Sequence, residues 1–178
     1  MVVRQDGELK RAVERLAAAH AFPLDKLFVV DGSSRSAHST AFFAGLREKR
    51  IVLYDTLLKQ TDEAEVLAIL AHEMGHWKAG HLTRGLVLML AVLFVQLALF
   101  GQFVHNETLY SSFGFAERPA LVGLLLFFQV AFTPLFPLLS FALSALSRSH
   151  EFAADSFAAA GGHGEALQTG LVKVRAFV

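Results

Sequence analysis

The sequence predicts a mainly α-helical membrane protein with a small antiparallel β-sheet and a two-helix transmembrane hairpin. Three observations support this fold class. Of the 178 residues, 54% are hydrophobic, with a mean hydropathy of +0.47. Two long segments contain no charged residue, and a third segment carries an HExxH motif on a predicted helix. Soluble domains usually carry fewer apolar residues, so much of this chain is expected to face lipid.

The charge and cysteine counts exclude several kinds of partner and site. The 16 Lys and Arg residues balance the 16 Asp and Glu residues, so no polyanion such as nucleic acid is expected as a partner. The chain has no cysteine, which excludes disulfides and thiolate metal ligands. Imidazole and carboxylate groups are therefore the strong metal ligands that remain.

Residues 1–84 form a polar part that is expected to face the cytosol. Apolar side chains recur at helical spacing over Asp6–His20, which predicts an amphipathic helix that ends before Pro23. Thr61 is the expected N-cap of a second helix, which runs to about Gly80 and has acidic residues in its first turn. Between these helices, short apolar runs separated by turn residues predict three strands of an antiparallel sheet: Leu27–Val30, Thr40–Ala44 and Ile51–Tyr54.

Residues 85–146 are expected to form a transmembrane hairpin. The segments 85–104 and 120–146 contain no Asp, Glu, Lys or Arg. About 20 helical residues cross roughly 30 Å of hydrocarbon, so the first segment fits, and the second can tilt or bend at Pro134 and Pro137. The alternative is a pair of buried core helices, but a chain this short has few other residues to cover them.

The HExxH motif places metal-binding chemistry on the helix at residues 61–80. Residues four apart share a helix face, so His72 and His76 can present ring nitrogens to one zinc ion. Glu73 then lies beside the vacant coordination position, where it can accept a proton from water and later donate it to the departing amine. These features indicate peptide hydrolysis without a covalent intermediate. The alternative is that both histidines only satisfy local hydrogen bonds.

The third ligand is expected in residues 147–178, after the hairpin. If both apolar segments cross the bilayer, the chain returns to the same membrane face just before Glu151. Glu151 can complete a His, His, Glu ligand set, and Asp155 can accept the second N–H of a ligating imidazole. By themselves, a Glu and an Asp at this spacing are more typical of a solvated helix face, and the HExxH motif and the hairpin are what favour the metal site. His81 is not expected to bind, because it lies on a different helix face from His76.

Several longer motifs indicate a family. The segments DGSSRSAHSTAFFAGL, KRIVLYDTLL, LAHEMGHWKAGH, FQVAFTPLFPLLS and LSRSHEFAADSFA resemble the CAAX prenyl protease type 1 family of integral-membrane zinc peptidases. The resemblance covers nearly the whole chain and includes the zincin-like HExxH helix and an ExxxD motif. It implies zinc bound by His72, His76 and Glu151, with Glu73 as general base and acid. It also implies that Asp155 is the carboxylate that accepts a hydrogen bond from a zinc-binding imidazole.

The family also implies a substrate and a location. Its members remove the last three residues after a prenylated cysteine, in the endoplasmic reticulum membrane and nuclear envelope. Their fold is a ring of seven transmembrane helices around a water-filled chamber, so this chain is expected to be a fragment of the C-terminal catalytic half. The arginine and histidine thought to stabilise the tetrahedral intermediate in the family are expected in a further C-terminal segment, outside this chain.

The stretch from His38 to Gly45 is a candidate substrate-binding strand. An extended peptide can add to such an edge strand through backbone hydrogen bonds, although an ordinary strand of the small sheet fits the pattern equally. Where the family typically has Ser-Asn-Ala, this chain has Ser39-Thr40-Ala41, which replaces a substrate-binding amide with a hydroxyl. His38 and Thr40 are therefore the predicted substrate contacts, and each is also consistent with a surface residue.

Charged residues next to the spans predict the orientation of the chain. Lys78, Arg84 and Arg148 flank the spans on the side of the predicted metal site, whereas the loop from His105 to Pro119 offers only Arg118. The positive-inside rule then places the site in the cytosol or nucleoplasm. The sequon Asn106-Glu107-Thr108 lies on the lumenal side, too close to the bilayer to be glycosylated.

Two other functions remain open from the sequence. A relative of the bacterial heat-shock membrane metalloprotease would use the same ligands to degrade misfolded membrane proteins. A catalytically silent truncated form would act as an interaction partner. If the chain is part of a CAAX prenyl protease, which is the favoured function, its expected partners are a prenylated CAAX protein or peptide and membrane lipid.

Overall fold

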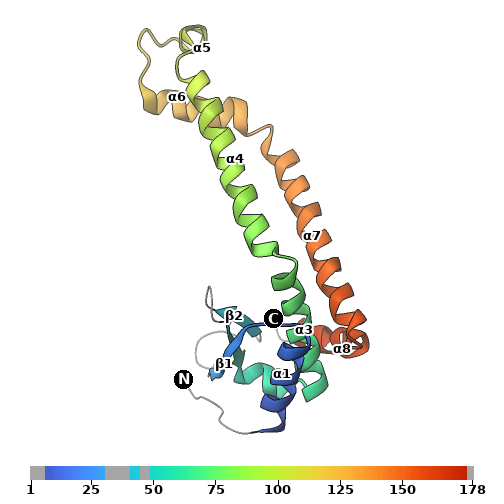
Figure 1. The fold of residues 1–178 in the computed structure, drawn as a ribbon. Coiled ribbons are helices and arrows are strands. Elements are labelled where there is room, and N and C mark those ends of the chain that lie inside the picture. The colour runs from blue at the N-terminus through green and yellow to red at the C-terminus, as the bar shows by residue number, and fades with distance from the viewer. Residues whose placement is uncertain (1–6, 31–40, 45–48, 176–178) are drawn as a thin grey trace. The chain divides into compact units, whose positions relative to one another are not determined.

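The computed structural model describes residues 7–30, 41–44 and 49–175. The chain divides into two compact units, which are described separately. The first unit combines Met1–Gly80 with His150–Val178, and the second is His81–Ser149. Residues from both ends of the sequence therefore fold together in the first unit. Figure 1 shows the elements in chain order by colour.

The first unit contains a three-stranded sheet with helices packed against it. The amphipathic helix forms as predicted, with Ala12, Val13, Leu16 and Ala17 buried on one face. The helices and strands that lie wholly in this unit are α1 (Glu8–Ala19), β1 (Leu24–Val30), β2 (Ala41–Ala44), β3 (Lys49–Tyr54), α2 (Asp55–Gln60), α3 (Glu63–Lys78) and α8 (Gly164–Arg175). The last part of α7 (Phe136–Ala160) also belongs to this unit.

The sheet is mixed, so the expectation of a purely antiparallel sheet is wrong. The strand order is β1-β3-β2. The pair β2 and β3 is antiparallel, as expected, but β1 and β3 run parallel. Strand β2 runs opposite to β3, whereas β1 runs in the same direction as β3. This order leaves β2 at an edge of the sheet.

The HExxH helix begins one residue later than predicted. Asp62, and not Thr61, is the N-cap of α3, because its side chain accepts a hydrogen bond from the backbone N–H of Glu65. The Glu65 side chain in turn accepts from the backbone N–H of Asp62, which completes a capping box. Thr61 instead donates its hydroxyl to the carbonyl of Leu57, at the end of α2.

Helix α3 is the centre of the hydrophobic core of the first unit. Most of its apolar residues are buried against α1, the sheet and α8. Seventeen buried residues form one cluster that includes residues from every helix and strand of this unit: Val13, Leu16, Ala17, Phe22, Leu27, Ala41, Ile51, Leu53, Leu57, Val66, Ala68, Ile69, Leu70, Ala71, Met74, Ala158 and Leu167. The metal-binding motif therefore lies on the most buried helix of the unit.

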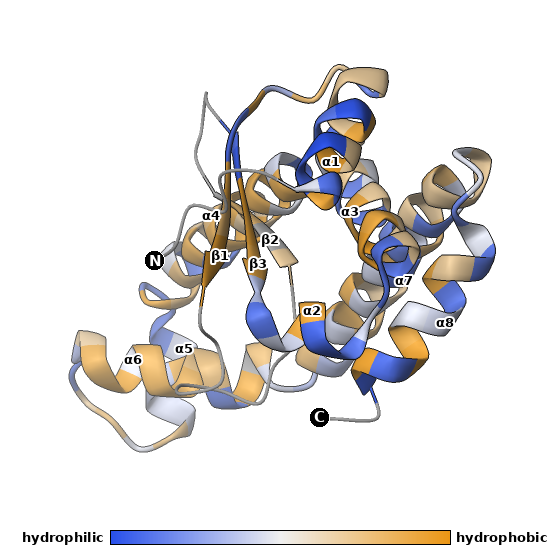
Figure 2. Ribbon diagram, turned by 90° about the horizontal axis from the view of Figure 1, so that it is seen from below, coloured by the Kyte–Doolittle hydropathy of each residue, from blue (hydrophilic) through white to orange (hydrophobic). Residues whose placement is uncertain are grey.

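The second unit consists of α4 (His81–Phe103), α5 (Glu107–Ser112), α6 (Ala120–Leu126), the π-helix η1 (Phe127–Phe132) and the first part of α7. Among the described residues, α4 is the one helix that is long and apolar enough to cross a membrane. It begins four residues before the predicted span, which started at residue 85. Figure 2 shows α6 coloured mostly as hydrophobic, in agreement with its sequence.

The second predicted span, residues 120–146, does not form one helix. Helix α6 passes into η1, a turn follows at residues 133–135, and α7 begins at Phe136. Pro134 lies in this turn, where its missing N–H and its clash with the preceding residue interrupt the helix. Pro137 is accommodated in the first turn of α7, where no helical N–H is required. The apolar residues 136–146 are therefore continuous with the polar end of α7 that carries Glu151.

Candidate metal centre

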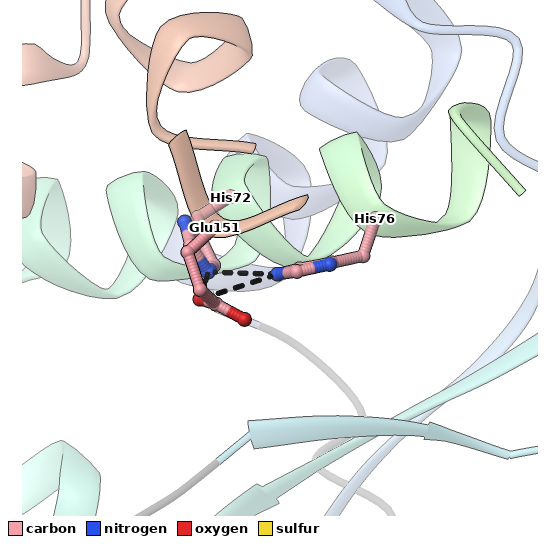
Figure 3. Close-up of side chains that lie close together, drawn as sticks. All are labelled: His72, His76 and Glu151. Carbon is pink, nitrogen blue, oxygen red and sulfur yellow. Dashed lines mark hydrogen bonds and ion pairs between the residues drawn. The ribbon is translucent and has the colours of Figure 1, made fainter. Parts of the chain in front are cut away.

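Two imidazoles of α3 and one carboxylate of α7 converge on one point in the first unit. The Nε2 atoms of His72 and His76 are 3.1 Å apart. Oε2 of Glu151 lies 3.5 Å from Nε2 of His72 and 3.6 Å from Nε2 of His76. Figure 3 shows the three side chains pointing toward one another from the two helices. Helical spacing explains the two histidines, and α7 supplies the carboxylate from 75 residues further along the chain.

Asp155 determines how His72 is oriented. Its Oδ1 atom lies 2.9 Å from Nδ1 of His72, on the opposite side of the ring from His76. Because a carboxylate accepts hydrogen bonds, this contact assigns the proton to Nδ1 and leaves a lone pair on Nε2. Asp155 is one helical turn after Glu151, so both carboxylates reach the same imidazole from one face of α7.

The surroundings shift the pKa values of two groups in the centre. Burial lowers the pKa of His76, although the nearby Glu151 carboxylate partly opposes this effect. The His76 imidazole is therefore neutral at physiological pH, which is the form that binds metal. Burial also raises the pKa of Glu73, and the charge of His72 partly offsets this shift. A carboxylate with a raised pKa is a better proton acceptor near neutral pH than an exposed one.

The three atoms fit a zinc ion. Zinc binds imidazole nitrogen and carboxylate oxygen at about 2.0–2.2 Å, and the ligands of a tetrahedral site are then about 3.3–3.6 Å apart. The observed separations of 3.1, 3.5 and 3.6 Å lie close to that spacing. Among the described residues, these are the His, Cys, Asp or Glu side chains that group closely enough to hold a metal. A set of two nitrogens and one oxygen without thiolate suits zinc.

Gly75 allows the two helices of the centre to approach each other. A Cβ atom at Gly75 would lie 3.1 Å from Cα of Ala154 and 3.1 Å from Cβ of Phe157. Helix α7 therefore packs directly on the backbone of α3 between the two histidine turns. This role of Gly75 is not among the expectations drawn from the sequence. A signal was present, because a glycine inside a helix costs roughly 0.5–1 kcal/mol relative to alanine, and such a residue often marks close packing.

The predicted site residues divide into two groups. The structure brings together His72, His76, Glu151 and Asp155, and it places Glu73 next to them on α3. His81 is not a member of the potential ligand group among the described residues. The two predicted substrate contacts, His38 and Thr40, lie outside the described residues.

A comparison with protein-family models matches residues 3–175 to peptidase family M48. The chain belongs to this family. Its HExxH helix and the distant glutamate therefore lie in an M48 peptidase domain. Membership in M48, a family of metallopeptidases, agrees with the His, His, Glu group that the structure assembles.

Similar M48 proteins share one name. The chain is 45% identical over 172 residues to a protein of Arabidopsis thaliana named CAAX prenyl protease 1 homolog. It is 38% identical over 188 residues to CAAX prenyl protease 1 of Saccharomyces cerevisiae. Each match covers 96% of this chain, but only 40% and 41% of the respective relative. The resemblance to the CAAX prenyl protease type 1 family is therefore confirmed, and the chain spans about two fifths of the length of these relatives.

A solved structure is similar over almost the whole chain. The crystal structure of S. mikatae Ste24p matches with a TM-score of 0.81 and 38% sequence identity. The match covers 98% of this chain and 43% of the other. The mainly helical fold with its small sheet therefore agrees with the fold of that structure.

Proposed function

We propose that the protein containing this chain is a zinc metalloendopeptidase that removes the C-terminal tripeptide from isoprenylated CAAX proteins. The observation that supports the proposal is the convergence of His72, His76 and Glu151, with Asp155 hydrogen-bonded to Nδ1 of His72. The names of the similar proteins support the substrate class. The relatives are more than twice as long as this chain, so the proposal concerns the whole protein.

The side chains of the centre have distinct roles in this proposal. His72 and His76 bind zinc through Nε2, Glu151 binds through a carboxylate oxygen, and Asp155 holds the His72 ring. A bound zinc ion supplies a Lewis acid that polarises the scissile carbonyl and makes water more acidic. Glu73 accepts a proton from the attacking water and donates it to the departing amine. Its raised pKa suits both steps, because the carboxyl can hold the proton between them.

We also propose that the protein is a multi-pass protein of the endoplasmic reticulum membrane, and of the nuclear envelope, with the centre facing the cytosol or nucleoplasm. Helix α4 supports a membrane location. Lys78, Arg84 and Arg148 support the orientation, since basic residues favour the cytosolic side. On the loop that would face the lumen, Arg118 pairs with Glu107 at 3.1 Å, which offsets its positive charge.

The decisive experiment combines metal analysis with a peptide assay on the full-length protein. We expect Glu151→Ala to lower zinc occupancy, because it removes a ligand. Glu73→Ala should keep zinc but reduce turnover of a farnesylated CAAX peptide by about 10²–10⁴-fold, because general acid–base catalysis is lost. Zinc content is measured by mass spectrometry and cleavage by product release. Full activity of Glu73→Ala would exclude it as the base.

A second peptide tests the substrate class. The wild-type protein should cleave the farnesylated peptide and leave its unprenylated counterpart intact. Cleavage of unlipidated, unfolded membrane proteins instead would indicate the quality-control protease, and zinc binding without cleavage of either would indicate the silent form.

A further inference from the structure

Two basic residues of the first unit, His20 and Lys78, lie against the ring of Phe157, and a third, His163, lies in the turn after α7. His20 follows the last residue of α1, Lys78 is the last residue of α3, and His163 precedes α8. The ring centroids of His20 and Phe157 are 4.7 Å apart. Nζ of Lys78 lies 5.4 Å from the Phe157 centroid, within the range of a cation–π interaction. We call His20, Lys78 and His163 the basic cluster.

The turn between α7 and α8 brings His163 into this cluster. The backbone N–H of His163 donates to the carbonyl of Ala158, 3.0 Å away, so the turn folds back on the end of α7. Burial lowers the pKa of His20, and the positive charges of Lys78 and His163 lower it further. These charges therefore act on His20 from two other elements, α3 and the α7–α8 turn.

The basic cluster lacks an acidic partner in the described part of the chain. None of its three side chains forms an ion pair there with a carboxylate, whereas Lys10, Lys59 and Lys173 each do. The helix dipole favours a cation at the end of a single helix, and this effect explains His20 or Lys78 individually. It does not explain why His20 and Lys78 both lie against one ring while no carboxylate of the described residues forms an ion pair with either. An anion at this point would give the Lys78 ammonium group a partner of opposite charge.

The chain connection places the basic cluster close to a membrane surface. Lys78 precedes the first residue of α4 by three positions, and three residues span at most about 10 Å. Each headgroup layer of a bilayer is roughly 5–8 Å thick, so the exposed Lys78 side chain is within reach of lipid phosphates if α4 crosses the membrane. His20 and His163 are half-buried beside it and can donate N–H groups.

We propose that the basic cluster of His20, Lys78 and His163 binds the phosphate of an anionic phospholipid in the leaflet where α4 begins. Lys78 provides the positive charge, the two imidazoles donate hydrogen bonds, and Phe157 holds His20 and Lys78 in place. Cytosolic leaflets are rich in anionic lipids, which matches the proposed orientation. The role is binding, and it is separate from the peptidase activity.

The test measures lipid binding by the delipidated full-length protein in detergent. Native mass spectrometry gives the Kd of the first bound dioleoylphosphatidylserine and, in parallel, of dioleoylphosphatidylcholine. We expect tighter binding of phosphatidylserine. Lys78→Gln should weaken it about fivefold, which corresponds to the roughly 1 kcal/mol that a basic residue contributes at an anionic membrane surface. His163→Gln should also weaken it, and Lys78→Arg should retain it.

Two controls keep the proposal falsifiable. Arg84→Gln removes the same charge from a nearby exposed position of α4, and Lys10→Gln removes it from α1. Neither should change the Kd, and thermal unfolding checks that each variant is folded. An equal loss in Arg84→Gln would show diffuse attraction and overturn the site, as would equal binding of the two lipids. Saturation of the cluster by millimolar inorganic phosphate, with loss of the lipid preference, would overturn the assignment to lipid.

Discussion

The hydrogen bond from His72 to Asp155 decides which imidazole nitrogen faces the ligand group. The Nδ1 proton points to Asp155, so Nε2 keeps its lone pair toward His76 and Glu151. Without this contact the ring could rotate or change tautomer. The carboxylate therefore contributes to metal binding through the geometry of its neighbour.

The substitution Asp155→Asn tests this role. We expect it to weaken zinc affinity by about 10–100-fold, because an amide holds the protonated Nδ1 less firmly and makes the imidazole a poorer ligand. Affinity is measured by competition with a fluorescent chelator. Asp25→Asn is the matched control, since Asp25 forms a surface ion pair with Arg50 and should leave zinc affinity unchanged. Wild-type affinity in Asp155→Asn would contradict the role.

The main residues of the centre could be predicted because their spacing limits the possible geometry. Two histidines four apart on a helix must share a face, and a return through the hydrophobic segment was enough to select Glu151 and Asp155. The role of Gly75 could not be predicted, because it depends on which helix packs there. The basic cluster could not be predicted either, since its three members come from distant parts of the sequence.

At the scale of helices, the close contact of α3 and α7 sets the position of Glu151. We expect Gly75→Ala to lower zinc affinity, because the added Cβ would push α7 away from α3. Overpacking of this kind typically costs about 1–3 kcal/mol in stability. Gly85→Ala in α4 is the matched control, since a Cβ there meets no atom within 4 Å. Zinc titration and thermal unfolding measure both effects, and unchanged affinity in Gly75→Ala would contradict the packing argument.

Helix α8 is joined to the start of α3 by an ion pair between the buried Glu65 and the exposed Lys173. Glu65 is only 3% exposed, and Nζ of Lys173 lies 2.6 Å from one of its carboxylate oxygens and 2.7 Å from the other. A Cβ at Gly170 would lie 3.2 Å from Cβ of Glu65, so the two helices touch at this point. The hydrogen bond from Lys173 holds the pKa of Glu65 below its ordinary value of 4.5, and burial partly opposes this shift.

This pair predicts a pH dependence of stability. A carboxylate with a lowered pKa in the folded state stabilises that state above its unfolded pKa, and the contribution is lost as the pH falls through the folded pKa. Glu65→Gln should therefore lower the melting temperature at pH 7, and the difference from wild type should shrink below about pH 4.5. Thermal unfolding across this pH range measures it. Glu63→Gln, at an exposed position of the same helix, should show no such trend.

Hydrophobic spacing predicted most elements well but could not define how they pair. Short apolar runs between turn residues indicated the three strands, yet this pattern is the same for parallel and antiparallel neighbours, so the expected antiparallel direction was wrong for the pair β1 and β3. The cap of α3 was missed by one residue, although Asp62 followed three positions later by Glu65 is the pattern of a capping box. Pro134 indicated the interruption of the second span, but composition alone did not show that α7 would continue to Ala160.

For the molecule as a whole, α4 is the helix on which the proposed membrane location rests. We expect Leu90→Arg to reduce membrane insertion of this segment, because an arginine near the middle of a span costs about 2.5–3.5 kcal/mol. A glycosylation reporter in microsomes measures the inserted fraction. Val172→Arg, at an exposed apolar position of α8, is the control and should insert normally. Equal insertion of both variants would argue against α4 as a span.

Helix α7 joins an apolar half to the half that carries Glu151 and Asp155 without a loop between them. The number of helical residues between these halves therefore sets which way the side chains of one half face relative to those of the other. One inserted residue would rotate one half against the other by about 100° and shift it by 1.5 Å. Either the carboxylates or the apolar side chains would then face the wrong way. Evolutionary insertions and deletions should consequently be rare at residues 147–150 and more frequent in the loop at residues 113–119.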